Sequence, residues 1–157
     1  MHLKLLIADW KDLAGSVRVV DEGPFSLSRQ VVPVDEDRVV FLPRDYPSMR
    51  GKIFNVKTLE TSELPIAGCV PELWRQATKQ LLCFDIDRAE HLLIGLDGRN
   101  RERVGPFNFV PLLYLTELDA ALIGFEDGHD HRVAIFSLKG TSKNRPAGDL
   151  LAMLSGV

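Results

Sequence analysis

The chain has 157 residues, of which 45% are hydrophobic and 26% are charged, and its formal net charge is −3. These values are ordinary for one globular domain, and they exclude the strongly basic surface that attracts nucleic acid or anionic lipid in general. No apolar run approaches the roughly twenty residues of a membrane span, so we expect a cytoplasmic protein without membrane contact.

Short apolar stretches separated by Gly, Pro, Asp and Asn predict a chain built mainly of strands. In the first half the predicted strands cover residues 3–8, 17–20, 30–34, 38–42 and 52–57. The acidic corner Asp35-Glu36-Asp37 falls between two of them, where a hairpin turn favours such residues. Because recognition residues lie mostly on loops, Asp35, Glu36 and Asp37 are candidate binding residues for a protein partner.

A helix is predicted between the two halves. Pro71 and Glu72 are typical of a first helical turn, and the apolar residues that follow recur at helical spacing, at Leu73, Trp74, Ala77 and Leu81. Cys69 lies just before this predicted helix and Cys83 inside the next predicted strand. We expect two reduced, partly buried thiols, with a disulfide between them as the alternative.

The second half contains predicted strands at residues 81–86, 92–97, 112–116, 120–125 and 132–138. Near its end, Leu150, Leu151 and Leu154 form a short apolar stripe. Such a stripe predicts a short C-terminal helix that either covers the sheet or makes a homodimer contact.

Residues 23–58 recur without a gap as residues 105–140, with nine identities over 36 positions where residue usage would give about two. Ile53-Phe54 and Ile135-Phe136 are shared, and we predict that all four are core residues of a central strand. The predicted fold is therefore mainly β (α+β), in a single compact domain over residues 1–157. Two pseudo-symmetric antiparallel β-meander or small-barrel halves from an internal duplication, about residues 1–79 and 80–157, would be joined by one connecting helix and followed by a short C-terminal helix. In architecture alone this resembles the doubled small barrels of signalling adaptors.

The sequence Glu126-Asp127-Gly128-His129-Asp130-His131 predicts a hairpin tip with an Asp-Gly turn. That turn would place Glu126 opposite His129, with His131 on the same side of the hairpin. Two imidazoles and a carboxylate are a ligand set for zinc or non-haem iron. The simpler interpretation is a solvated polar tip, and we expect no cofactor there.

Arg99, Arg101 and Arg103 alternate along a segment that is peculiar to the second half. Three guanidinium groups on one side of a loop could hold a phosphate or an acidic partner, and Phe107 and Phe109 could stack on a base. A solvated loop followed by two core phenylalanines is the simpler interpretation.

Asp85 and Asp87 alternate at a strand end, as do carboxylates that hold magnesium in nucleotidyl-transfer sites. A turn after the strand, with Asp85 facing solvent, is the simpler interpretation.

We expect a non-enzymatic cytoplasmic protein-binding module, either an adaptor or an inhibitor or immunity-type partner. One alternative is a small metal-dependent enzyme centred on Glu126, His129 and His131. The other is a phosphate or nucleic-acid binder that uses Arg99, Arg101 and Arg103, although the net charge makes nucleic acid an unfavoured partner.

Overall fold

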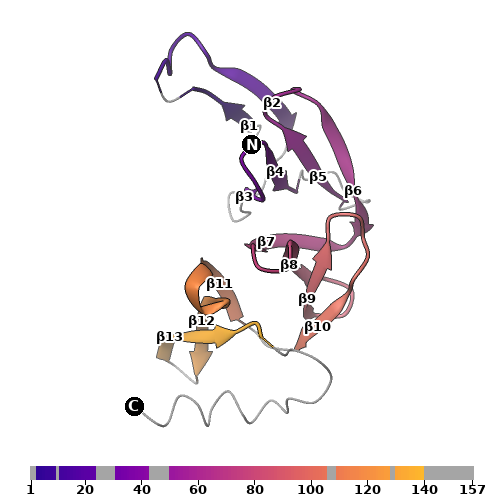
Figure 1. Cartoon of the computed structure of the whole chain (residues 1–157), viewed down its shortest axis with the longest axis vertical. Helices are drawn as coiled ribbons and strands as arrows, with labels where there is room; N and C mark the ends of the chain where they lie inside the picture. The colour runs from indigo at the N-terminus through magenta and orange to yellow at the C-terminus, as the bar shows by residue number, and fades with distance from the viewer. Residues whose placement is uncertain are drawn as a thin grey trace.

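The computed structural model describes residues 3–9, 11–23, 31–42, 50–105, 109–127 and 130–139. These residues form four antiparallel sheets, which follow one another along the long axis of the molecule (Figure 1). The mainly β prediction is confirmed, and each of the ten predicted strands overlaps an observed one. Within the described residues there is no α-helix, and no helix has the length and apolarity to cross a membrane.

The four sheets contain thirteen strands. A hairpin consists of β1 (Leu3–Ile7) and β2 (Arg18–Gly23). The first meander consists of β3 (Val32–Pro33), β4 (Arg38–Phe41), β5 (Arg50–Asn55) and β6 (Thr61–Ala67). The middle meander consists of β7 (Cys69–Arg75), β8 (Gln80–Asp85), β9 (Glu90–Gly95) and β10 (Glu102–Gly105). The last meander consists of β11 (Phe109–Leu115), a 3-10 turn (Thr116–Leu118), β12 (Ala120–Asp127) and β13 (Asp130–Ser137).

Three meanders follow one another along the chain. The second strand of each meander, β4, β8 or β12, begins at residue 38, 80 or 120, in steps of 42 and 40 residues. A Val-Pro pair lies in the first strand of each meander, at Val32-Pro33, Val70-Pro71 and Val110-Pro111. The matched segments share one strand order, β3 to β5 and β11 to β13, and the middle meander lies between them. The internal duplication into two halves stays a prediction.

The predicted small barrels are not seen, because none of the sheets formed by the described residues closes on itself. Instead, β7 lies against both β3 and β11, so the first strands of successive meanders are neighbours.

The predicted helix at Pro71 is strand β7. Cys69, Pro71, Leu73 and Arg75 alternate with more exposed residues along it, which is the two-residue period of a strand. Pro71 is tolerated because the pairing with β8 is irregular between Pro71 and Leu73, as at a bulge. The predicted C-terminal helix with Leu150, Leu151 and Leu154 lies outside the described residues.

Cys69 and Cys83 form a buried disulfide between β7 and β8, with their Cα atoms 5.6 Å apart. The prediction of reduced thiols is therefore wrong. It depended on the predicted helix, whereas the observed hairpin places Pro71 opposite Cys83 and so brings Cys69 close. Disulfides are typical of oxidising compartments, so the cytoplasmic location stays a prediction that this bond does not favour.

The middle meander is buried on both of its faces. One core lies between the first and middle meanders and contains Val32, Val34, Val40, Leu64, Ile66, Cys69, Leu81, Cys83, Leu92 and Ile94. The other lies between the middle and last meanders and contains Leu73, Leu82, Leu93, Phe109, Ala121, Ile123, Ala134, Phe136 and Leu138. Consecutive residues such as Leu81 and Leu82 thus enter different cores, as in packed sheets whose faces are both covered.

Candidate protein-binding surface

The outer side of the last meander is apolar and exposed. Its large side chains are exposed by 50% to 61%, and they are Val110, Leu112 and Leu113 of β11 and Val133 and Ile135 of β13. A single exposed apolar side chain is ordinary, but five on one three-stranded sheet form a patch. We call these five residues the apolar face.

The strand register explains why these side chains point the same way. Residues opposite one another in an antiparallel pair share one side of the sheet. The two central rows of the exposed side are Val110–Gly124–Val133 and Leu113–Leu122–Ile135. Leu112 belongs to the same side, because its Cδ1 is 3.7 Å from where a Cβ of Gly124 would lie.

The opposite side of the same strands is the buried one. Ile123, Ala134 and Phe136 alternate with the residues of the apolar face and pack against the middle meander. One face of the last meander is therefore a protein core, while the other, of similar composition, is left in solvent.

A buried ion pair fixes the last meander to the middle one. The carboxylate of Asp119 accepts hydrogen bonds from Arg75 Nε at 2.8 Å and from Arg75 Nη2 at 2.6 Å. The Tyr114 hydroxyl donates to Asp119 Oδ1 at 2.9 Å. Asp119 has a φ of 47° and ends the 3-10 turn before β12. Because a bidentate pair of this kind is geometrically specific, it holds the apolar face in a fixed orientation.

The electrostatics of this group favour its observed protonation states. The hydrogen bonds from Arg75 lower the pKa of the Asp119 carboxyl, and the hydroxyl of Tyr114 adds to the effect. Burial raises the pKa of the Tyr114 hydroxyl, and its bond to the Asp119 carboxylate raises it further. The carboxylate therefore stays ionised and the phenol stays neutral near neutral pH.

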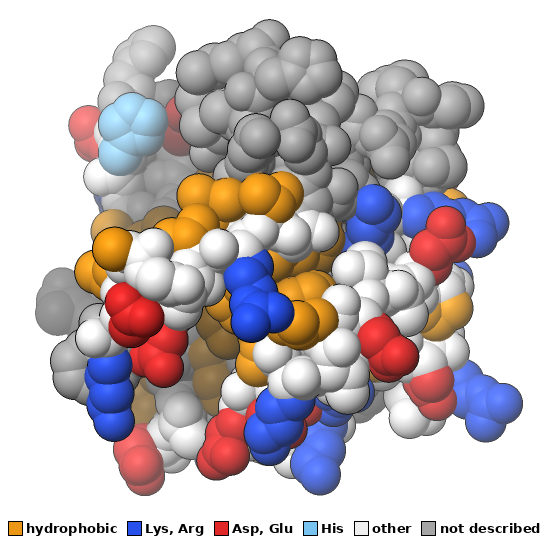
Figure 2. Space-filling view, turned by 90° about the horizontal axis from the view of Figure 1, so that it is seen from above, with side chains coloured by type: hydrophobic (Ala, Val, Ile, Leu, Met, Phe, Trp, Pro, Cys, Tyr) orange, Lys and Arg blue, Asp and Glu red, His pale blue; other side chains and the backbone are white. Residues whose placement is uncertain are grey.

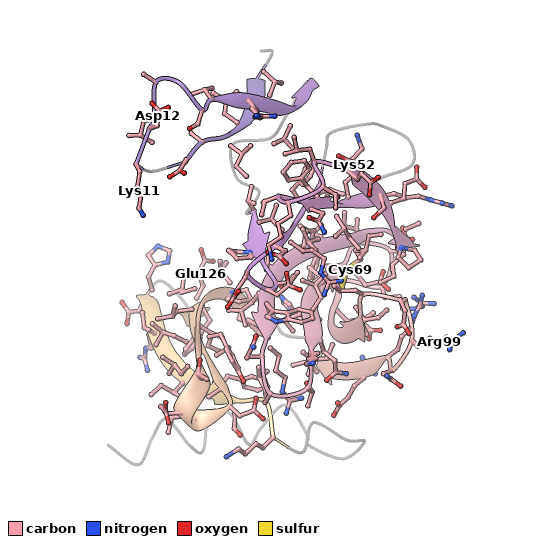
Figure 3. The ribbon with its side chains drawn as sticks, turned by 45° about the horizontal axis from the view of Figure 1, so that its top comes forward. Lys11, Asp12, Lys52, Cys69, Arg99 and Glu126 are labelled. Carbon is pink, nitrogen blue, oxygen red and sulfur yellow. A yellow bond between two sulfur atoms is a disulfide. The ribbon has the colours of Figure 1, made fainter. Side chains whose placement is uncertain are left out.

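The tip of the β12–β13 hairpin borders the apolar face. Glu126 lies opposite His131, so the predicted pairing of Glu126 with His129 is wrong. The turn lies one residue further along the chain than predicted, because Asp127 pairs with Asp130. His131 Nδ1 and Glu126 Oε1 are 3.9 Å apart and both side chains are exposed; Figure 3 shows Glu126 at this end of the sheet.

The metal ligand set at this tip stays a prediction. His129 lies outside the described residues. In the part of the chain that the structure describes, no three or more His, Cys, Asp or Glu side chains are grouped so as to hold a metal ion.

The acidic corner forms the predicted turn between β3 and β4. Asp35 Oδ2 accepts a hydrogen bond from Arg38 Nε at 2.7 Å, and this pair lowers the pKa of the Asp35 carboxyl. Asp37 Oδ2 lies 2.8 Å from Lys57 Nζ, and this contact raises the pKa of Lys57. Two carboxylates of the corner are thus paired within their own meander, while Glu36 is exposed. Binding by Asp35, Glu36 and Asp37 stays a prediction.

The predicted arginine site lies away from the hairpin tip. Arg99, Arg101 and Arg103 are all exposed. Arg103 Nε is 2.6 Å from Glu90 Oε2, and Arg99 Nε is 3.9 Å from Asp97 Oδ2. Figure 3 shows Arg99 on the opposite side of the view from Glu126. Acidic and basic side chains are interspersed on the face seen in Figure 2. Phosphate or nucleic-acid binding by Arg99, Arg101 and Arg103 stays a prediction.

Asp85 closes the turn between β8 and β9. Its Oδ1 accepts hydrogen bonds from the backbone N–H groups of Asp87 at 3.1 Å and Arg88 at 3.2 Å. Arg88 Nη1 donates to Asp85 Oδ2 at 2.8 Å. The turn interpretation is confirmed, but the predicted exposure is wrong because Asp85 is buried.

Two aromatic residues that we considered for base stacking have different outcomes. Phe109 is buried in the core between the middle and last meanders, so the core interpretation is confirmed for it. Phe107 lies outside the described residues.

His91 is a buried polar group that the sequence analysis did not identify. Its ring stacks on Phe109 with centroids 3.9 Å apart and is tilted against Phe84. Its Nε2 is 3.2 Å from Glu72 Oε2, yet neither ring nitrogen of His91 makes a hydrogen bond. Because the ring packs against the aromatic rings of Phe84 and Phe109, we assign His91 to packing.

The apolar face was also missed by the sequence analysis, which placed Ile135 in the core. Ile135 is 56% exposed and its neighbour Phe136 is 7% exposed. The run Val133-Ala134-Ile135-Phe136 is apolar on both sides of a strand, which predicts two covered faces. This apolar run was visible in the sequence, but the sequence cannot show whether a second layer covers the outer side of the strand.

Comparisons of the chain with models of known protein families, with curated proteins and with solved structures each found no match.

Proposed function

We propose that this protein is a non-enzymatic protein-binding module of the adaptor or inhibitor type, and that the apolar face is its docking surface. Five large apolar side chains exposed on a single sheet are the observation that carries the proposal. Patches of this kind on soluble proteins mark sites where another macromolecule binds.

The apolar face is held in place by the rest of the fold, which suits a docking role. Its strands are hydrogen-bonded to one another, and its other side is packed against the middle meander. The Arg75–Asp119 pair adds a fixed anchor. Because little conformational freedom is left to lose, a partner that binds here meets a small entropic cost.

The surroundings of the apolar face also resemble the rim of a protein interface. Glu126 and His131 lie at its tip end, and Asp130 and Arg132 are beside them. An apolar centre with a polar, solvent-accessible rim is the usual anatomy of such surfaces.

Site-specific photo-crosslinking tests the proposal. A photoreactive amino acid is placed at Ile135 in the full chain, and in a control at Ile86, which is exposed but lies in a turn of the middle meander. After irradiation in extract of the source cells, we expect a discrete protein adduct from position 135 and none from position 86. Addition of excess unlabelled wild-type protein should suppress the adduct, whereas Ile135→Lys protein should not.

Equal adducts from both positions, or none from position 135, would show that the apolar face is not a docking surface.

A further inference from the structure

We propose, on the basis of that docking function, that the partner of the apolar face is a second copy of this chain, packed sheet on sheet about a twofold axis. The complementary surface for an exposed apolar sheet face is another such face, with side chains interdigitating across about 10 Å.

The chain already makes contacts of this type within itself. The first and middle meanders meet through one apolar core, and the middle and last meanders meet through another. The apolar face presents the same kinds of side chain, mainly Val, Leu and Ile, at the same alternation. A third contact of this type, made between molecules, would give the last meander the two covered faces that the middle meander has.

The far side of the first meander cannot supply that cover. Phe41 and Phe54 lie on the side opposite Val40 and Ile53, and both phenylalanines are buried. A head-to-tail contact, with the last meander of one copy on the first meander of another, therefore finds no exposed apolar sheet face in the described residues. The two last meanders are left to face each other, which is the self-complementary contact of a closed dimer.

The β1–β2 hairpin has a smaller apolar surface. Leu6 and Val19 lie opposite each other on its two strands, and Leu13 and Val17 of the connecting segment are exposed as well. Among the side chains that the structure describes, this surface has a single cross-strand pair, compared with two rows across three strands on the last meander. Contact between the hairpin of one copy and the apolar face of another would also leave free surfaces at both ends, so it would give open chains rather than dimers.

The rim of the apolar face carries charges of both signs. Acidic Glu126 and Asp130 lie beside His131 and Arg132 at the tip. Charged groups at the rim of an interface contribute to specificity more than to affinity.

The size of the face sets the expected strength. β12 and β13 have eight residues each. A three-stranded face of that length is about 27 Å by about 14 Å, or about 380 Å² on each copy, which is smaller than in stable specific interfaces and places the contact among weak, transient ones. We therefore expect a dimer that dissociates at micromolar concentration rather than an obligate one.

Sedimentation equilibrium of the full chain tests the inference, over loading concentrations from about 1 to about 500 µM. The weight-average mass should rise from 17.6 kDa toward twice that value. Ile135→Lys should raise the dimer dissociation constant at least about tenfold, because it places a charge in the buried centre. Ile86→Lys is the matched control and should leave the constant within about twofold.

Folding of each variant is checked by circular dichroism. Val110→Lys, at the opposite edge of the apolar face, provides an independent variant if Ile135→Lys fails to fold. A photoreactive residue at position 135 should also give a covalent dimer with purified protein.

Three results would overturn the inference. The first is a mass that stays at 17.6 kDa throughout. The second is a dimer that persists in folded Ile135→Lys and Val110→Lys, which would move the contact elsewhere, for example to residues 140–157. The third is growth beyond a dimer. If the protein stays monomeric but position 135 crosslinks a different protein in extract, the proposed docking function stands and only the second copy is excluded; if it crosslinks nothing, both fail.

Discussion

The middle and last meanders share a strand order, yet they differ in how many of their faces are covered. Leu81 and Leu82 of the middle meander are consecutive and both fully buried. Ile135 and Phe136 of the last meander are also consecutive, and only Phe136 is buried. Strands of similar apolar composition thus have different surroundings, because the last meander is packed on one side only.

This difference separates residues that hold the fold from residues that are left exposed on the apolar face. In the middle meander an apolar side chain on either side contributes to folding. In the last meander the two sides of one strand have different roles, so substitutions at adjacent positions should have different effects on stability.

The largest effect is expected from Phe136→Ala, which should lower the free energy of unfolding by about 4 kcal/mol because it empties a buried aromatic site. Ile135→Ala, one residue away on the exposed side, should cost less than about 1 kcal/mol. Denaturant titration of the monomer, at a protein concentration well below the expected dimer dissociation constant, measures both. Similar losses at the two positions would show that the last meander is covered on both sides even in the monomer.

The strands were predictable because their period and their turn residues are local properties. Asp35 to Asp37 and Asp85 to Asp87 form turns as expected, and the buried side chain of Phe54 was predicted too. The spacing of the meanders along the chain was harder to predict from the sequence. Adjacent meanders share a Val-Pro pair and a strand pattern, whereas the first and last meanders, 82 residues apart, share more identities. A search for identities therefore matched the first and last meanders and did not identify the middle one.

The errors come from properties that depend on contacts distant in sequence. Leu73, Trp74, Ala77 and Leu81 fit a helical spacing, but Leu73 and Trp74 belong to strand β7 and Leu81 to strand β8. Ala77 lies in the exposed turn between these strands. The disulfide followed from that pairing and was missed with it. Exposure of Ile135 depends on the absence of a further covering layer, which composition cannot indicate.

Arg75→Met tests the contact between the two meanders. It should lower the free energy of unfolding by about 3 to 4 kcal/mol, because it leaves the buried Asp119 carboxylate without its cation. Arg38→Met is the matched control, since its partner Asp35 is exposed, and it should cost less than about 1 kcal/mol. Thermal and chemical denaturation measure both. Equal, small effects would mean that Asp119 is solvated and that the ion pair does not hold the meanders together.

Loss of the disulfide tests the middle meander alone. Cys69 and Cys83 are 14 residues apart, and a loop of about this length predicts a loss of about 3 kcal/mol on removal of the crosslink. The variant carrying both Cys69→Ala and Cys83→Ala should show this loss together with a small packing cost. A reducing agent should destabilise the wild-type protein and leave the double variant unchanged. Insensitivity of the wild type to reduction would contradict the crosslink.

A smaller effect is expected from pH, because the contribution of Asp119 to the free energy of unfolding depends on its ionisation. The pKa of Asp119 is lowered in the folded state, so its contribution to stability is present above the ordinary carboxyl value and is lost as the pH falls through the folded-state value. The difference in unfolding free energy between wild type and Arg75→Met should therefore shrink below about pH 4. Urea titrations at several pH values measure it. A difference that stays constant down to about pH 2 would show that the Asp119 carboxyl is not ionised in the wild type.

The smallest effect is expected at His91, between the middle and last meanders. Its ring nitrogens are buried and make no hydrogen bond, and Glu72 Oε2 likewise makes none. Replacement by an apolar side chain of similar volume removes the two unsatisfied ring nitrogens and leaves Glu72 Oε2 as it is, although it also loses the stacking on Phe109. His91→Leu should therefore leave the free energy of unfolding unchanged or raise it by up to about 1 kcal/mol. His91→Ala, which leaves a cavity as well, should lower it by about 2 kcal/mol. A loss above about 2 kcal/mol in His91→Leu would mean that a polar partner satisfies the imidazole in the folded protein.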